Sequence, residues 1–349
     1  MIAPVALQSL ATAAPPHVFA QEEVAEAAHR LFDHQVPGYV RLAKVFGTAG
    51  IRRRQMIMPL EWYLTPRGWP ERTEAYLTGA TDLFVHAATG ALAEAGIMGA
   101  EVDVIVTVSS TGITTPSLEA RAMDRMGFRS DAARIPVFGL GCAGGATGLA
   151  LAARLAGAQP GATVLLVCVE ACSMAFRTEA PGKADIVATA LFGDGAAALV
   201  VRSGDEGFAT VTGFAEHTWP DTLDVMGWRV DPTGLGVIFD RAIPPFARAH
   251  LRPAIDQMLE GQGLEVGDVD RFICHPGGAK VLEALEGALD LGQGSLDAER
   301  AVLEDHGNMS APTVLHVLDR VRRRGLPARS VVTALGPGFT ASTVTLAAA

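Results

Sequence analysis

The chain has 349 residues, of which 49% are apolar and 19% charged, and its formal net charge at pH 7 is -10. This composition excludes a disordered chain and argues against general affinity for nucleic acid, whose phosphates repel an acidic protein. No apolar run is long enough to span a bilayer, and the four cysteines have neither zinc-finger spacing nor the density of a disulfide framework. We therefore expect a globular protein of the reducing cytoplasm, without stable membrane insertion.

The predicted elements begin with a strand over residues 2–10 and a helix over Gln21–Phe32, in which apolar side chains recur on one side. Residues 33–72 are rich in Pro, Trp and Arg and show no such periodicity, so we expect an irregular loop region over a site. A long helix is predicted from Glu74 to Ala95, because its apolar residues recur at helical spacing.

The next pattern is a short apolar run, residues 136–138, that ends in glycines and is followed by Cys142 and a small-residue helical pattern over residues 146–155. It predicts a strand, a sharp turn that carries the cysteine, and a helix. The partial positive charge of a helix N-terminus favours a thiolate, and glycines let a substrate approach the sulfur closely. A lone cysteine is more often an inert buried residue, so this pattern needs support from elsewhere in the chain.

The same glycines also fit a dinucleotide-binding fingerprint. Gly139, Gly141 and Gly144 have the G-x-G-x-x-G spacing, and Glu170 ends the next predicted strand, where a ribose-binding acid could lie. A Rossmann fold explains none of the motifs that follow later in the chain, and these motifs favour a different fold.

Landmarks along the chain recur at matching intervals. A strand after an acidic turn begins near Asp103 and again near Asp270. From Asp103 to Cys142 is 39 positions, and from Asp270 to Asn308 is 38. A helix follows each of these end points, and a further strand begins 21 positions after Cys142 and 22 after Asn308. The spacing implies an internal duplication, with each copy an α/β unit.

We therefore predict an α/β protein of two halves, residues 1–215 with Cys142 and residues 216–349 with Asn308 and His275. Ligands of α/β folds collect outside strand ends, and a pseudo-two-fold axis would bring these three side chains together. A thiol, an imidazole and a carboxamide suggest acyl transfer through a thioester, in which His275 pairs with the thiolate and Asn308 donates to an oxyanion. Taken singly, the histidine could cap a turn and the asparagine a helix.

Five motifs in chain order resemble those of type III polyketide synthases, the chalcone synthase-like branch of the thiolase superfamily. They occupy residues 141–145 (GCAGG), 191–198 (LFGDGAAA), 275–278 (HPGG), 306–310 (HGNMS) and 336–338 (GPG). The resemblance spans nearly the whole chain. It implies the thiolase fold, with duplicated α/β halves that form a layered αβαβα core, and a homodimer that needs no metal or bound organic cofactor.

The resemblance also implies a reaction. Cys142 would be acylated by a starter acyl-CoA, and malonyl-CoA would lose its carboxylate to give an enolate that attacks the thioester in a Claisen condensation. His275 and Asn308 would stabilise the enolate and the oxyanion. Repeated condensation and ring closure would then give the product, with acyl-CoA and malonyl-CoA as the small-molecule partners.

Phe192 and Phe239 match two phenylalanines that the family places between the CoA tunnel and the cavity, although on burial alone both would be taken as core residues. The resemblance places further residues at the cavity wall: Ser110, Cys172, Ala175, Ser310, Gly336, Pro337 and Gly338.

Basic residues near the N-terminus are candidates for binding CoA phosphates. Arg41 and Lys44 lie near the positions that the family uses. The runs at 52–54 and 322–324, each of three arginines, are other candidates for an anionic ligand, but such runs are usually solvated faces.

The segment Met226-Gly227-Trp228 resembles bacterial members that make alkylpyrones or alkylresorcinols from fatty acyl starters. We therefore expect a medium or long acyl-CoA starter and a pyrone or resorcinol product. The sequence leaves the starter, the number of extensions and the mode of ring closure open, because they depend on a cavity built from many segments.

Three alternatives remain at this stage. Ketoacyl-ACP synthase III shares the triad, but its histidine usually lies in a His-Gln-Ala-Asn setting and not before Pro276. A papain-like hydrolase also has Cys, His and Asn in this order, but the tryptophan-bearing signature around its cysteine is missing here. A thiolase-fold scaffold could bind acyl groups without turnover.

Overall fold

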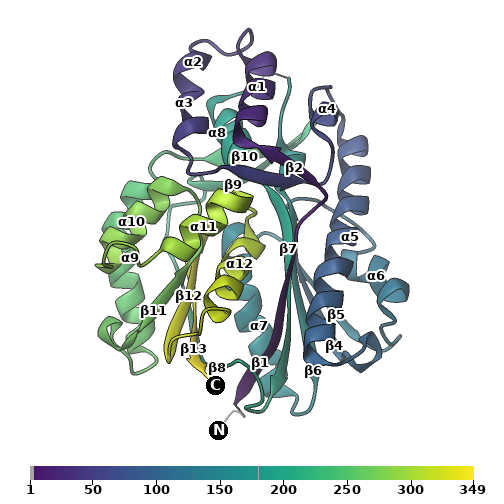
Figure 1. The fold of residues 1–349 in the computed structure, drawn as a ribbon, viewed down its shortest axis with the longest axis vertical. Coiled ribbons are helices and arrows are strands. Elements are labelled where there is room, and N and C mark those ends of the chain that lie inside the picture. Colours follow the sequence, from purple (N-terminus) through teal and green to yellow (C-terminus); the bar gives the residue numbers. More distant parts are fainter. Residues whose placement is uncertain (1–3, 180) are drawn as a thin grey trace.

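The computed structural model describes residues 4–179 and 181–349. Its frame is a nine-stranded mixed sheet with the order β11-β12-β13-β8-β1-β7-β6-β4-β5, together with two hairpins, β2-β3 and β9-β10 (Figure 1). The strands of the first half and its hairpin are β1 Val5–Ala13, β2 His17–Ala20, β3 Arg53–Met56, β4 Val104–Val108, β5 Ala133–Val137, β6 Thr163–Ala171 and β7 Asp194–Ser203. Those that follow are β8 Ala209–Thr218, β9 Met226–Asp231, β10 Gly234–Phe239, β11 Arg271–Cys274, β12 Arg329–Gly336 and β13 Thr340–Ala348.

The strand order is symmetric about the junction of β1 and β8. β4 pairs with β6 in parallel, and β6 and β1 both flank β7 antiparallel. The second half repeats this pattern. β11 pairs with β12 in parallel, and β12 and β8 both flank β13 antiparallel. The two acidic turns are also equivalent, since Asp103 Oδ2 accepts the N–H of Thr163 and Asp270 Oδ2 accepts that of Arg329, each at 2.8 Å. The duplicated α/β halves are thus confirmed.

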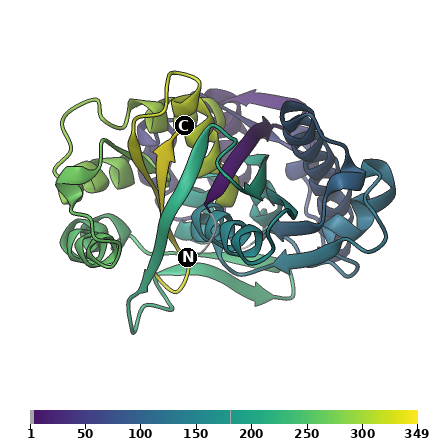
Figure 2. The same cartoon turned by 90° about the horizontal axis from the view of Figure 1, so that it is seen from below.

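Helices form three layers around the two halves of the sheet. α7 and α12 lie between the halves, because α7 packs on both β6 and β13 and α12 on both β7 and β11. α5 and α6 cover the outer side of the first half, and α9 and α10 that of the second (Figures 1 and 2). These helices are α5 Trp69–Ala95, α6 Leu118–Met126, α7 Gly144–Ala158, α9 Ile243–Glu260, α10 Ala279–Leu289 and α12 Ala311–Arg322.

The small residues of α7 let the two central helices approach closely. A Cβ atom on Gly145 would lie 2.6 Å from Val314 Cγ1 and would also meet the carbonyl of Ala311, so only glycine fits there. A Cβ atom on Gly148 would lie 2.9 Å from Val108 Cγ2 on the facing strand. The glycine- and alanine-rich pattern after Cys142 is therefore a packing requirement of the central layer.

The upper part in Figure 1 is a cap over one end of the central helices. The helix over Gln21–Phe32 forms as predicted. The expectation that residues 33–72 are irregular is wrong, since they contain short helices and β3, and α5 begins at Trp69. Buried Tyr39, Phe46 and Tyr63 anchor these short elements. The remaining helices are α1 Gln21–Phe32, α2 Tyr39–Leu42, α3 Lys44–Thr48, α4 Leu60–Tyr63, α8 Lys183–Leu191 and α11 Asp297–His306.

Two expectations from the sequence, on membrane insertion and on the division into halves, can be compared with the fold. In residues 4–179 and 181–349 there is no helix with the length and apolar character needed to cross a membrane. The predicted division after residue 215 stays a prediction, and residue 215 itself lies within β8.

Candidate active site

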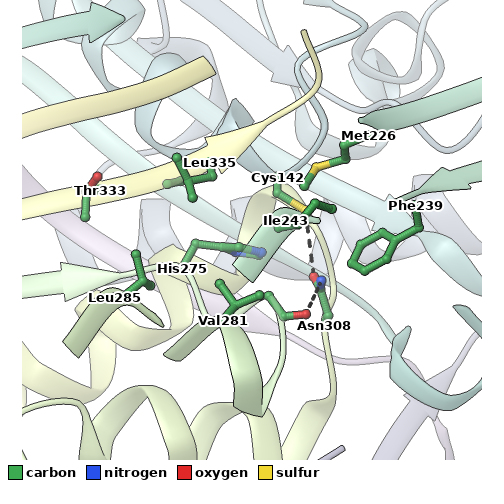
Figure 3. A pocket seen from close by; sticks show the side chains of 12 residues that line it. Cys142, Met226, Phe239, Ile243, His275, Val281, Leu285, Asn308, Thr333 and Leu335 are labelled. Atoms are coloured by element: carbon green, nitrogen blue, oxygen red, sulfur yellow. Dashed lines mark hydrogen bonds between the residues drawn. The ribbon is translucent and has the colours of Figure 1, made fainter. Parts of the chain in front are cut away.

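The three predicted catalytic side chains line one pocket of about 440 Å³. Cys142 comes from the start of α7, His275 from the end of β11 and Asn308 from the segment before α12. Figure 3 shows the sulfur, the imidazole and the carboxamide around the same space. Apolar side chains complete the wall: Met226, Phe239, Ile243, Val281, Leu285 and Leu335.

Cys142 lies on a 3-10 turn over Gly141–Ala143 that leads directly into α7. The backbone of Gly141 has φ 49°, in the left-handed region that favours glycine. Ser110 Oγ accepts the N–H groups of Gly139 and Gly141 at 3.1 and 3.2 Å. The turn is therefore held by a hydroxyl from the end of the neighbouring strand β4, which fixes the direction of the thiol.

Asn308 lies beside the sulfur with its carboxamide orientation fixed. Its Oδ1 is 4.0 Å from Cys142 Sγ and accepts the N–H of Ser310 at 2.8 Å. Its Nδ2 donates to the carbonyl of Gly277 at 3.2 Å, just after His275. Because one amide hydrogen is used in this way, the second remains for an oxyanion in the pocket.

His275 is 4% exposed, and neither ring nitrogen has a hydrogen-bond partner in the described part of the chain. Its backbone N–H donates to Thr333 O at 2.9 Å, which continues the parallel pairing of β11 with β12. An unpaired buried imidazole is costly, so its nitrogens are best understood as reserved for a bound group.

Burial raises the pKa of Cys142 to about 11, although interactions with the side chains of Ser310 and Asn308 oppose the shift. Burial also lowers the pKa of His275 to about 3. Loss of hydration thus opposes the thiolate that the helix start favours. Burial therefore disfavours both charged forms, the Cys142 thiolate and the His275 imidazolium, when each stands alone.

The two predicted gatekeepers are both at the hairpin β9-β10, because Phe239 is the last residue of β10 and Phe192 contacts β9. Phe192 is 7% exposed and contacts Trp228 edge to face, with ring centroids 6.1 Å apart. Phe239 lines the active-site pocket and also a larger surface pocket of about 1370 Å³. Phe239 therefore lies where the two spaces meet.

The surface pocket carries three cationic side chains, Arg41, Lys183 and Arg241. Arg41 was predicted from the sequence, whereas Lys183 and Arg241 were missed because each is a single charge in an otherwise ordinary segment. Lys44, on α3, does not line this pocket.

The arginine runs are not free basic patches. Arg52 pairs with Glu304 and Asp305, and Arg53 with Asp305. Arg54 is fully buried.

The other run is also neutralised in part. Arg322 pairs with Glu94 and Asp319, and Arg323 pairs with Asp319.

The other residues predicted at the cavity fall into three groups. Ser310 is 6% exposed, and its N–H donates to Oδ1 of Asn308 beside the sulfur. The segment 336–338 packs behind the nucleophile turn, where Pro337 Cδ lies 2.7 Å from the position of a Cβ on Gly141. Ser110 holds the turn, while Cys172 and Ala175 are buried in a short helix and do not line the pocket.

Two apolar wall residues were missed although a signal existed. Val281 and Leu285 lie four positions apart on α10, which begins just after His275, so helical spacing places both on one face toward the pocket. Within residues 4–179 and 181–349, no group of three or more His, Cys, Asp or Glu side chains is arranged to hold a metal ion.

Glu170, which was considered above as a ribose-binding acid, is instead part of the hydrogen-bond network that supports the end of β4. It is fully buried, and its Oε2 accepts the N–H of Ser110 at 2.9 Å and the hydroxyl of Thr111 at 2.7 Å. It therefore supports the same strand end that holds the nucleophile turn.

Comparison with known proteins agrees with this geometry. Residues 3–205 match the family "Chalcone and stilbene synthases, N-terminal domain", and residues 212–349 match the corresponding C-terminal domain. A 1,3,6,8-tetrahydroxynaphthalene synthase of Streptomyces peucetius subsp. caesius is 40% identical over 343 residues, which are 96% of this chain and 91% of the relative. A putative chalcone synthase of Bacillus subtilis (strain 168) is 34% identical over 348 residues, 95% of each chain.

Among solved structures, the 1,3,6,8-tetrahydroxynaphthalene synthase of Streptomyces coelicolor A3(2), described as a bacterial type III polyketide synthase, superposes with a TM-score of 0.93 at 30% identity. The match covers 98% of this chain and 99% of that one. The predicted thiolase fold is thereby confirmed, and ketoacyl-ACP synthase III is not favoured. The chain belongs to the chalcone and stilbene synthase family and is a type III polyketide synthase, an acyltransferase.

Proposed function

We propose that Cys142 is the nucleophile that carries the growing chain. Its sulfur attacks the carbonyl of a CoA thioester, the carbon–sulfur bond to CoA breaks, and the thiol proton passes through His275 to the departing CoA sulfur. The supporting observation is that sulfur, imidazole and carboxamide line one pocket although they come from distant parts of the chain.

His275 and Asn308 would then act on malonyl-CoA. As the bond to the malonyl carboxylate breaks and CO2 leaves, negative charge moves onto the thioester oxygen, where Nδ2 of Asn308 and a ring N–H of His275 can donate to it. The enolate carbon forms a bond to the Cys142 thioester carbonyl, and the Cys142 thiolate leaves. The apolar wall favours loss of the carboxylate, because a charge there is poorly solvated.

Malonyl-CoA is proposed to supply both the starter and the extension units, with a small aromatic polyphenol as product. Relatives with a named product are 1,3,6,8-tetrahydroxynaphthalene synthases and 3,5-dihydroxyphenylacetyl-CoA synthases. The fatty acyl starter and the pyrone or resorcinol product expected from the segment at 226–228 are not supported by them.

The CoA moiety is proposed to lie in the surface pocket. Arg41, Lys183 and Arg241 can pair with its phosphates, and Phe239 lies between this pocket and the sulfur. No resident cofactor is required by these steps, and a cytoplasmic location remains a prediction that the free thiols favour.

The test is product analysis by mass spectrometry. The purified protein is incubated with isotopically labelled malonyl-CoA alone, and in parallel with acetyl-, hexanoyl- and octanoyl-CoA added. We expect an aromatic product from malonyl-CoA alone, with label in every carbon unit. Product formation only when a fatty acyl-CoA is supplied would overturn the choice of starter.

A matched pair of variants tests the role of the nucleophile. Cys142→Ala is expected to abolish acyl loading, seen as loss of the mass increase on the intact protein, and to stop product formation. Cys274→Ala, which alters a buried cysteine one position before His275, is expected to leave loading in place. If the protein is instead a scaffold that binds acyl groups without turnover, the wild-type protein will also form no product.

A further inference from the structure

We propose that Arg54, a buried arginine outside the pocket, is a positioning residue that fixes Asn308 through the C-terminus of α8. This inference deepens the proposed function and rests on the role given there to Asn308. Arg54 is in β3, beneath the cap, and it is the largest fully buried side chain in the described part of the molecule.

The Arg54 guanidinium binds backbone carbonyls almost exclusively. Nη1 donates to the carbonyls of Thr189 and Phe192 at 2.6 and 2.8 Å, and Nη2 donates to that of Ala190 at 3.0 Å. Nη2 also donates to Oε1 of Gln21. Burial lowers the pKa of Arg54 to about 9, so the guanidinium stays protonated at neutral pH and keeps all of these donors.

These carbonyls are the ones that the end of a helix leaves without partners. α8 ends at Leu191, and the carbonyl of Ala188 accepts the N–H of Phe192 at 2.8 Å. Arg54 binds the carbonyls of 189, 190 and 192. The carbonyl of Leu191 accepts the N–H of Asn308 at 2.8 Å. Gln21 Nε2 also donates to the Ala190 carbonyl, at 3.0 Å. Every carbonyl from 188 to 192 is therefore satisfied, and Arg54 or Asn308 donates to each of those from 189 to 192.

Asn308 is held on both sides by this same segment. Besides its bond to Leu191, its carbonyl accepts the N–H of Gly193 at 3.0 Å, so that it forms a parallel bridge with Phe192. Gly193 permits the approach, because a Cβ there would collide with the carbonyl of His306. Movement of residues 189–193 would thus be transmitted directly to the backbone of Asn308.

Only arginine can make this set of contacts. Its planar fork presents several donors in fixed directions, whereas a lysine ammonium is a single point on a flexible stem. Lysine would keep the positive charge at the negative end of the helix dipole but could not reach carbonyls on three residues at once. The geometry therefore predicts graded effects, with Arg54→Lys milder than Arg54→Met.

The experiment compares two activities in Arg54→Met, Arg54→Lys and the wild-type protein. The first is decarboxylation of malonyl-CoA, which needs Asn308 as a donor to the oxyanion, and the second is alkylation of Cys142 by iodoacetamide, which needs no such donor. We expect Arg54→Met to lower kcat for decarboxylation on the order of 10²-fold, as displacement of a catalytic group by about 1 Å can do. KM for malonyl-CoA and the alkylation rate should change by less than about threefold, and Arg54→Lys should recover part of kcat.

Arg53→Met is the matched control, since Arg53 is the neighbour on the same strand and its side chain is half exposed. It should retain wild-type kcat. Decarboxylation at the wild-type rate in Arg54→Met would overturn the inference. An equal loss of decarboxylation and of Cys142 alkylation in Arg54→Lys would also overturn it, because such a loss indicates general disruption of the site.

A crystal structure of Arg54→Lys separates failure of this inference from failure of the proposed function. We expect the N–H of Asn308 to lie beyond hydrogen-bonding distance of the Leu191 carbonyl, or the Asn308 carboxamide to turn away from Cys142. An unchanged Asn308 would overturn the inference whatever the enzyme makes, whereas a wild-type protein that does not decarboxylate malonyl-CoA would overturn the proposed function alone.

Discussion

Glu170 shows what a buried carboxyl near the nucleophile does to the molecule. Burial raises its pKa to about 7, although hydrogen bonds from Ser110 and Thr111 oppose the shift. One of its oxygens, Oε1, has no partner among the described residues, and the other accepts the bonds that hold the end of β4. Its charge is therefore unfavourable in the folded protein, while its shape and its acceptor oxygen are needed.

This carboxyl should make stability depend on pH. Its folded pKa lies above the unfolded value, so the folded state holds a proton that the unfolded state has lost, and stability falls as pH rises from about 4.5 to 7. The loss is at most about 3 kcal/mol. In Glu170→Gln the amide oxygen keeps the acceptor role without charge. Urea unfolding at pH 5 and pH 8 should show a smaller difference for this variant than for the wild type, and an equal difference would contradict the assignment.

The sequence predicted that three side chains with distinctive chemistry meet in one pocket, and it missed side chains with ordinary chemistry. Cys142 and Asn308 stood out because their spacing repeats across the halves, and His275 because it lies on the turn after the second of the repeated strands. Arg54 looked like part of a basic run, and only its contacts with carbonyls distinguish it from Arg53. A sequence does not reveal which charge of a run is turned inward, because burial depends on elements far along the chain.

At the scale of elements, the end of β12 supports the turn that carries Cys142. A Cβ atom on Gly336 would lie 2.6 Å from both Ala143 Cβ and the carbonyl of Leu140, and 2.7 Å from the N–H nitrogen of Ala143. These are mostly backbone atoms that cannot move aside. The glycine at this position is therefore required for close packing of a strand end from one half on a helix start from the other.

Gly336→Ala should displace the nucleophile turn. We expect a loss of about 1–3 kcal/mol in the free energy of unfolding, as for other overpacked sites, and slower acyl loading of Cys142 on the intact-mass assay. Gly267→Ala is the control, because a Cβ there meets nothing within 4 Å. Normal loading in Gly336→Ala would show that the turn can shift without consequence.

Elements with long periodic patterns could be predicted from the sequence, and short ones could not. The pattern over residues 21–32 gave α1 with its correct ends, because its buried and exposed positions alternate with helical spacing over three turns. α2 and α4 span four residues each, too few to show a period, and they persist because Tyr39 and Tyr63 are buried against the rest of the cap.

At the scale of the whole molecule, one face near the catalytic turn is open and apolar. Ile113 and Phe138 are 51% and 54% exposed. The segments that carry them are joined by two hydrogen bonds, from the N–H of Ser109 to Val137 O and from the N–H of Gly139 to Ser110 Oγ. β5 is the edge strand of the sheet beside them. An edge strand with exposed apolar neighbours is suited to pairing with a second copy, and the homodimer expected from the sequence stays a prediction.

Phe138→Glu should weaken this association. By light scattering after size exclusion, we expect the wild-type protein at twice the 36.4 kDa of one chain and the variant at a lower average mass. Met98→Glu, which places the same charge at a side chain 71% exposed in another part of the fold, should stay at the wild-type mass. A monomeric wild-type protein would contradict the prediction.

The matching aspartates, Asp103 and Asp270, have a consequence for how such chemistry can arise. If the two halves descend from one ancestral unit, then Cys142 and Asn308 occupy what was once the same position, at the start of the same helix. Divergence at that site would then have made a symmetric pair of helix starts unequal, with the proposed covalent attachment on one side and the proposed charge stabilisation on the other. A fold repeated with little change in its frame could thus acquire catalysis through a few unequal substitutions.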